Sequence, residues 1–147
     1  MRTSLVSLVI FLAACPAQPP PKLPGSGDSP SVAGYFKGAW GELVLRQQGE
    51  KLRGVYGRDG GTVLGMLSGD TMIGWWCETP TRQPKDDAGD VELKFINNDD
   101  KLTIDGRWRD GAEGEWHDEL DLEKSTDMPA PALEERFSDA TSFCPKP

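Results

Sequence analysis

The chain has 147 residues and a formal net charge of −8 at pH 7, from 24 acidic and 16 basic side chains. This acidity argues against nucleic-acid binding, which needs basic clusters to displace counterions from phosphates, and against a polybasic contact with anionic lipid. The length allows a single domain with a modest core, so an additional covalent crosslink would matter to its stability.

The N-terminal segment has the organisation of an export signal. Arg2 is followed by an apolar run over residues 5–12 that is too short to span a bilayer, and the run ends in Leu12-Ala13-Ala14-Cys15. This motif resembles the lipobox of bacterial lipoproteins. The resemblance implies removal of residues 1–14, acylation of Cys15 by chains such as palmitate, and stable anchoring by two or three of them. The alternative is an ordinary secretory signal peptide with an incidental cysteine.

The same resemblance gives an expected location. In that family an aspartate after the cysteine typically retains the protein at the inner membrane, whereas Pro16 follows it here. We therefore expect a cell-envelope protein at the outer membrane rather than the inner one, with the leaflet left open. Residues 15–33 are rich in proline, glycine and serine and predict an extended tether between the lipid and the domain.

Residues 34–124 predict an all-β domain. Short segments of alternating apolar and polar residues are separated by hairpin signals such as Asp59-Gly60-Gly61 and Gly69-Asp70, and helical periodicity is absent. The predicted strands are residues 42–48, 51–57, 62–68, 71–78, 91–95, 102–108 and 116–122. We expect an antiparallel up-and-down meander of seven strands, or eight if residues 35–40 add one, in a strongly curled sheet or small β-barrel.

A recurring glycine two positions before an aromatic residue supports this architecture. Gly38-Ala39-Trp40, Gly54-Val55-Tyr56 and Gly106-Arg107-Trp108 share the spacing. It resembles the up-and-down meanders of the avidin and lipocalin families over residues 38–124. That likeness implies a barrel, but no ligand-binding motif carries over with it.

The two remaining cysteines, Cys77 and Cys144, are expected to form a disulfide in an oxidising compartment. Free thiols are the alternative, and zinc is disfavoured because the single His117 leaves too few ligands. Such a bond would tie back the C-terminal tail, residues 125–147, in which residues 132–137 predict one or two helical turns.

Catalytic groups are not evident. His117 is expected on a charged, solvated face of the last strand, opposite Trp116, and no serine has the setting of a nucleophile. We expect no enzyme activity, no cofactor and no metal site. Calcium at the acidic turns stays open, although solvated turns are the simpler interpretation; these residues are Asp86, Asp87, Asp90, Asn97, Asn98, Asp99 and Asp100.

The chain has five tryptophans, which is many for a domain of this size, and four of them form the candidate recognition surface. Trp75 and Trp76 are adjacent, so in a strand they point to opposite faces, and one of them must meet solvent, a partner or the tail. Cover by Phe137 or Phe143 of the tail is the favoured interpretation. The candidate partner or ligand surface comprises Trp75, Trp76, Trp108 and Trp116.

Two functions are compatible with this pattern. The first is a non-catalytic interaction or structural module that binds a protein partner in a cell-envelope assembly. The second is a carrier of a small apolar ligand or lipid inside the barrel. The predicted inward residues are bulky enough to fill a small barrel, which favours the first hypothesis; they are Leu43, Leu45, Leu52, Tyr56, Trp76, Leu93, Phe95, Trp108 and Leu122.

Overall fold

The computed structural model describes residues 30–147, so the predicted signal peptide, Cys15 and most of the tether lie outside the described residues. Eight strands follow in chain order: β1 Gly34–Gly38, β2 Gly41–Gln48, β3 Lys51–Tyr56, β4 Thr62–Ser68, β5 Thr71–Cys77, β6 Ala88–Asn98, β7 Lys101–Trp108 and β8 His117–Ser125. The helix α1, Pro131–Glu135, lies in the tail and is followed by short 3₁₀ turns.

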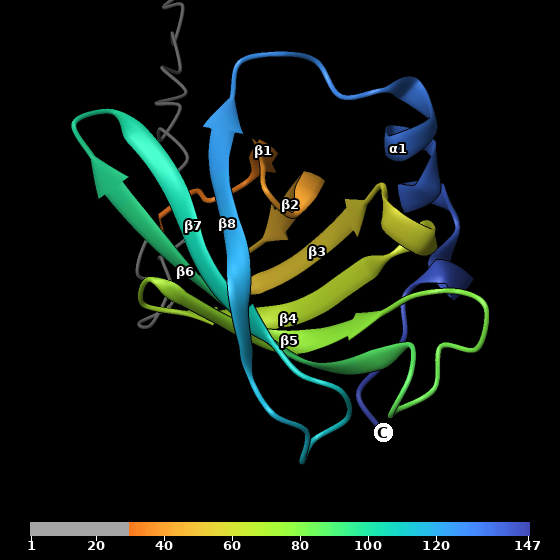
Figure 1. Cartoon of the computed structure of the whole chain (residues 1–147). Coiled ribbons are helices and arrows are strands. Elements are labelled where there is room, and N and C mark those ends of the chain that lie inside the picture. Colours follow the sequence, from red (N-terminus) through yellow and green to blue (C-terminus); the bar gives the residue numbers. More distant parts are fainter. Residues whose placement is uncertain (1–29) are drawn as a thin grey trace, which may run out of the picture.

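The strands form a closed barrel in which each pairs antiparallel with the next and β1 pairs with β8 (Figure 1). This confirms the predicted up-and-down meander and its closure. The eighth strand comes from the segment that the sequence left open, because Tyr35 pairs with both Val44 of β2 and Ser125 of β8.

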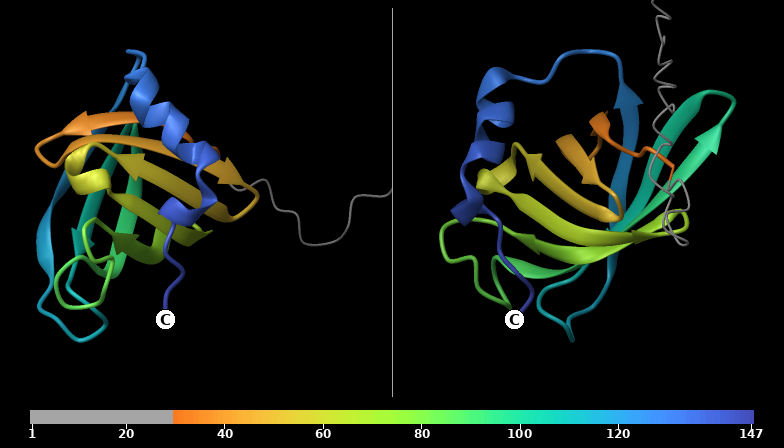
Figure 2. Two further views of the ribbon diagram at one scale, coloured as in Figure 1. Left: turned by 90° about the vertical axis from the view of Figure 1, so that its right-hand side faces the viewer. Right: turned by 180° about the vertical axis from the view of Figure 1, so that it is seen from behind.

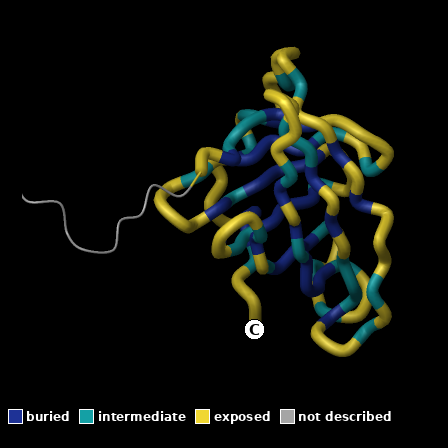
Figure 3. Tube along the Cα trace, turned by 90° about the vertical axis from the view of Figure 1, so that its left-hand side faces the viewer, coloured by how far each residue is buried: buried dark blue, intermediate teal, exposed yellow. Residues whose placement is uncertain are grey.

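Buried and less buried residues alternate along the strands (Figure 3), because every second side chain of a strand points into the barrel. Of the nine predicted inward residues, eight are buried there and Trp108 packs against them while partly exposed. Glycines make room at narrow points, as at Gly54, where a Cβ would lie 2.5 Å from the Val63 side chain. The interior is therefore filled by side chains.

The two ends of the barrel differ. The connections β1–β2, β3–β4, β5–β6 and β7–β8 lie at one end, which we call the mouth, because consecutive antiparallel strands reverse direction (Figure 1). The turns β2–β3, β4–β5 and β6–β7 lie at the other end, which we call the base. Every base turn is a two-residue hairpin, whereas residues 57–61, 78–87 and 109–116 form longer loops at the mouth.

The chain reaches the barrel at the base. The sequence assigned residues 30–33 to an extended tether, but Val32 is only 2% exposed and packs into the core cluster. Its backbone N–H donates a hydrogen bond of 2.9 Å to Gln47 Oε1. The last tether residues thus belong to the folded domain, because the open end of the barrel offers Val32 an apolar environment.

The tail covers the outer face of β1, β2 and β3 (Figure 2). Leu133, Phe137 and Phe143 pack on Val44 and Val55, which point outward. These strands are therefore buried on both faces, which accounts for the unbroken apolar run at residues 43–45. The helical turns predicted at residues 132–137 are present as α1 and the 3₁₀ turn Arg136–Ser138.

The predicted disulfide between Cys77 and Cys144 is present and joins the mouth end of β5 to the tail. Beside it, Lys146 Nζ lies 2.6 Å and Arg109 Nη2 lies 2.7 Å from the carboxylate oxygens of Asp90. Burial alone would raise the pKa of Asp90, but the hydrogen bonds from Lys146 and Arg109 outweigh it and hold the pKa below its usual value. None of the helices within residues 30–147 has the length and apolar character needed to cross a membrane.

Candidate ligand-binding site at the barrel mouth

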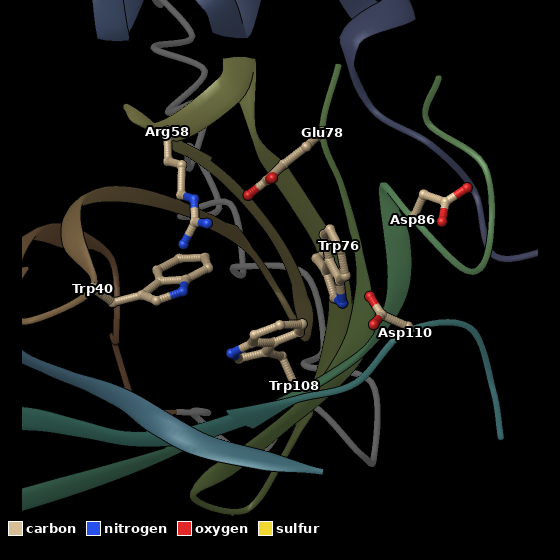
Figure 4. A pocket seen from close by; sticks show the side chains of 7 residues that line it. All are labelled: Trp40, Arg58, Trp76, Glu78, Asp86, Trp108 and Asp110. Atoms are coloured by element: carbon tan, nitrogen blue, oxygen red, sulfur yellow. The ribbon is translucent and has the colours of Figure 1, made fainter. Parts of the chain in front are cut away.

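A cavity of about 200 Å³ opens at the mouth. All four mouth connections or the strand ends beside them contribute to its lining (Figure 4). Trp40, Trp76 and Trp108 surround the space, and four charged side chains complete the lining: Arg58, Glu78, Asp86 and Asp110. Loops carried by a rigid barrel are a common location of binding sites, and barrel mouths are a frequent position for ligands.

Packing against the core fixes two of the three tryptophans. Trp76 is 5% exposed, and its indole N–H donates a hydrogen bond of 3.0 Å to the backbone oxygen of Arg109. Trp108 meets Trp76 edge to face, with ring centroids 5.5 Å apart. The two rings form a rigid side of the cavity, because Trp76 is buried and Trp108 packs against it.

Trp40 approaches from the β1–β2 turn and lies on Tyr56, with ring centroids 4.3 Å apart. Tyr56 is held by Gly61, where a Cβ would lie 1.9 Å from the phenol ring. The Tyr56 hydroxyl is buried and has no hydrogen-bond partner among residues 30–147. Burial raises the pKa of this hydroxyl, and the nearby Glu78 carboxylate raises it further through its negative charge and its side-chain contact with the hydroxyl.

The electrostatic character of the mouth is acidic. A second hollow of about 510 Å³ shares Trp40, Arg58 and Trp108 with the first and adds three carboxylates, those of Asp118, Glu119 and Asp121. Together the two hollows bring six carboxylates around one guanidinium. Burial raises the pKa of Glu78, and Asp59 and Asp87 add to the effect, while Tyr56 and Arg58 oppose it.

Leu120 and Leu122 are buried in the core and His117 is exposed, as predicted, but a register shift in the β7–β8 pairing changes the directions of Trp116 and His117. Gly106 pairs with Leu120, but Trp108 pairs with His117 instead of Asp118, so a bulge lies between them. His117 therefore stacks on Trp108, with ring centroids 4.3 Å apart. Trp116, expected among the apolar residues, lies on the outside between Arg107 and Arg109, each about 4.5 Å from its ring.

Of the four tryptophans predicted to form one surface, only Trp76 and Trp108 reach the cavity. Trp75 is 4% exposed and is covered by the tail, as predicted, but through Cys144 and Lys146. Phe137 and Phe143, which were expected to cover it, pack over β2 and β3 instead. Trp75 and Trp116 therefore do not line this cavity.

Sequence reasoning singled out Asp86, as a candidate calcium ligand, but missed Trp40, Arg58, Glu78 and Asp110. The sequence does contain a signal for this site. The connections between successive strands lie alternately at the two ends of the barrel, and those at the mouth contain or adjoin Trp40, Arg58, Glu78 and Asp110. In an up-and-down topology, every second connection lies at the same end.

The acidic residues considered for calcium do not form one site. Asp86, Asp87 and Asp90 lie at the mouth end of β6, whereas residues 97–100 form its turn at the base. Within residues 30–147, no group of three or more histidine, cysteine or carboxylate side chains is arranged to hold a metal ion.

We compared the chain with protein-family models, curated proteins and solved structures, and none of the three gave a significant match. The fold class, an eight-stranded antiparallel up-and-down barrel, is the extent of what the structure itself assigns.

Proposed function

We propose that this protein is a lipid-anchored, non-catalytic binding module of the bacterial cell envelope that docks another envelope component through the mouth of its barrel. The observation that carries the proposal is the cavity formed by three tryptophans and bordered by carboxylates. Exposed or half-exposed tryptophans in a well-packed setting are the residues on which binding energy concentrates.

The direction of the chain supports this role. The segment that leads to Cys15 joins the barrel at the base, the end opposite the cavity. An anchor attached there leaves the mouth free for a partner, and the tether predicted from residues 15–33 gives it reach. In this proposal the lipid sets the location at the envelope, with the outer membrane favoured, and the mouth sets the specificity.

A small-molecule carrier is the second candidate. Barrel mouths hold small ligands in many proteins, and the cavity here is open. However, sixteen buried residues already fill the interior, including Phe36, Leu93 and Trp76, and leave an apolar ligand or lipid chain little room inside. The mouth favours a polar or charged ligand group over an apolar one.

The proposal is tested by crosslinking the intact lipoprotein in membranes, recovering it and identifying bound components by mass spectrometry. Cys15→Ala removes the anchor. Asp86→Lys reverses an exposed charge at the mouth, and Glu50→Lys makes the same change at the base as a matched control. We expect a reproducible protein partner that is lost with Cys15→Ala and Asp86→Lys and retained with Glu50→Lys.

Two outcomes would contradict this function. If the partner is recovered equally well with Asp86→Lys, binding does not involve the mouth. If no protein is recovered but a small molecule or lipid co-purifies in stoichiometric amount, the carrier function replaces it.

A further inference from the structure

The tryptophans of the mouth differ from the aromatic residues on the outside of the barrel in one respect. On the outside, arginine and lysine side chains lie over ring faces: Arg46 over Phe137, Arg53 over Phe143, Arg107 and Arg109 over Trp116, and Lys146 over Trp75. Among the cation–ring contacts formed within residues 30–147, none involves Trp40, Trp76 or Trp108. The mouth therefore presents aromatic faces that no cation of the described chain uses.

The ion pairs of the carboxylates beside these rings are the second observation. Within the described part of the chain, Glu78, Asp86 and Asp110 form no ion pair with a basic side chain, whereas Asp90, Glu92, Glu123, Asp127 and Glu134 do. Arg58 lines the same cavity, but its side chain is 66% exposed and pairs only with its neighbour Asp59, at 3.7 Å. Three carboxylates and three tryptophan rings thus converge on one cavity, in which Arg58 is the single basic residue.

We infer that the mouth binds a quaternary ammonium group, with its methylated cation against Trp40, Trp76 and Trp108 and its charge balanced by Glu78 and Asp110. This inference rests on the part of the proposed function that makes the mouth a binding site, which both candidate functions share, and it names the chemistry of the group bound there. Aromatic rings attract such cations through their negative faces, and the attraction is strongest for tryptophan.

Size and hydration favour this ligand over the alternatives. A cavity of about 200 Å³ is smaller than the roughly 300–1,000 Å³ of pockets for drug-sized ligands, so it suits a compact group. A hard metal ion needs several converging oxygen ligands, and residues 30–147 contain no such group of three. A methylated ammonium is weakly hydrated and needs ring faces more than oxygen atoms. The hydroxyl of Tyr56, whose ring lies against Trp40, is buried and forms no hydrogen bond of standard geometry among residues 30–147, and its nearest polar neighbour is the Glu78 carboxylate of this cavity.

Quaternary ammonium chemistry has two sources in an envelope, a free solute and a lipid headgroup. In a headgroup, a phosphate accompanies the cation. Arg58 is the one basic residue that lines the cavity, and it would meet that phosphate. The effect of removing the Arg58 charge therefore distinguishes a lipid headgroup, which carries a phosphate, from a free solute, which does not.

The first experiment is isothermal titration of the full-length chain in an uncharged detergent. Choline is the probe, and 3,3-dimethylbutan-1-ol is its neutral isostere, with the same shape but no charge. We expect saturable choline binding with one site per chain, and at least about tenfold weaker binding of the isostere, because the ring faces contribute chiefly through charge. Equal binding of the two probes, or no choline binding, would overturn the inference.

Matched variants then locate the site. Trp108→Leu is expected to weaken choline binding about tenfold, and Trp116→Leu, which removes an outer ring, should leave it unchanged. Asp110→Asn is expected to weaken it about two- to fivefold, with Asp105→Asn on the outer face as the control. Thermal unfolding confirms that each variant is folded. If Trp108→Leu does not fold, Asp110→Asn and Arg58→Gln decide the question.

Arg58→Gln gives the most informative result. For a simple cation, removing this positive charge should tighten choline binding about two- to fivefold. With glycerophosphocholine as the probe, binding tighter than that of choline, and weakened by Arg58→Gln, would identify a headgroup. Weaker binding of glycerophosphocholine than of choline would identify a free solute. Loss of choline binding in a folded Arg58→Gln variant would contradict a cation balanced by Glu78 and Asp110 and would refute the inference.

Failure of this inference can be separated from failure of the proposed function. If the envelope partner is lost with Asp86→Lys but choline does not bind, docking at the mouth stands and the ligand chemistry is wrong. If choline binds at the mouth but partner recovery does not depend on Asp86, the ligand site stands and the docking role is wrong.

Discussion

The base and the mouth of this barrel are built from the same eight strands but organised in opposite ways. At the base, three two-residue turns and the buried Val32 bring the chain close to the core. A hollow of about 390 Å³ remains there, beside the point where residue 30 enters. At the mouth, longer loops hold tryptophans and carboxylates around an open cavity.

This difference between the two ends indicates which interactions stabilise each of them. Short hairpins are stabilised by local pairing and need no further support. The longer loops at the mouth lack that pairing, and the disulfide and the Asp90 ion pairs are found beside them. We infer that the disulfide and the Asp90 ion pairs hold the mouth in place, whereas the base is held by strand pairing, the packing of Val32 and the surface ion pair between Lys101 and Glu123.

The largest expected effect follows removal of the disulfide. Cys77→Ser with Cys144→Ser opens a covalent loop with a sequence separation of 67. On the chain-entropy model this lowers the free energy of unfolding by about 4 kcal/mol. Urea unfolding followed by tryptophan fluorescence measures it, with the wild-type chain under non-reducing conditions as the reference.

The same double variant tests the comparison between the two ends. Hydrogen exchange should increase first in the tail and in residues 78–87, and least in the three base turns. Equal increases at both ends would show that the disulfide stabilises the whole barrel and not the mouth in particular.

Asp90→Asn is expected to have the next largest effect. It removes the carboxylate that binds Arg109 and Lys146, and we expect a loss of about 1–3 kcal/mol, because both cations retain partial access to solvent. The pKa of Asp90 is lowered in the folded state, so its contribution is complete above the unfolded pKa of about 3.9 and is lost as the pH falls through the folded value.

Urea unfolding of the wild-type protein and Asp90→Asn at several pH values measures this difference. It should be constant near neutral pH and disappear in strong acid. A difference that grows as the pH falls would contradict the assignment.

Val32→Ala probes the base. The side chain is buried in the core cluster, and removing two methyl groups at about 0.8 kcal/mol each predicts a loss of about 1.5 kcal/mol. Ser31→Ala, at an exposed neighbour, is the control for the same measurement. The variant should leave choline binding at the mouth unchanged, and a change in binding would show that the two ends are coupled.

The sequence predicted the barrel well and the site only in part. Alternation and glycine-rich turns identified the strands, because these signals lie within a few neighbouring residues. The even number of cysteines left after Cys15 identified the disulfide without any knowledge of the fold. The faces of Trp116 and His117 were not predictable, because a single bulge between Gly106 and Trp108 reverses them. Val32 lies in a segment whose composition indicates a tether, and only the closed barrel provides the apolar space that buries it.

The smallest expected effect concerns the layer beneath the mouth. Tyr56→Phe removes a buried hydroxyl that has no hydrogen-bond partner among the described residues and keeps the ring that supports Trp40. An unsatisfied buried polar group destabilises a fold, so we expect the variant to be equally stable or more stable by up to about 1 kcal/mol. Urea unfolding measures the change. Val55→Ala, which removes outward apolar packing beneath the tail on the same strand, should be destabilising and serves as the contrast. A loss of 1 kcal/mol or more in Tyr56→Phe would mean that the hydroxyl donates to Glu78 in solution, and the carboxylate would then be less free to balance a bound cation.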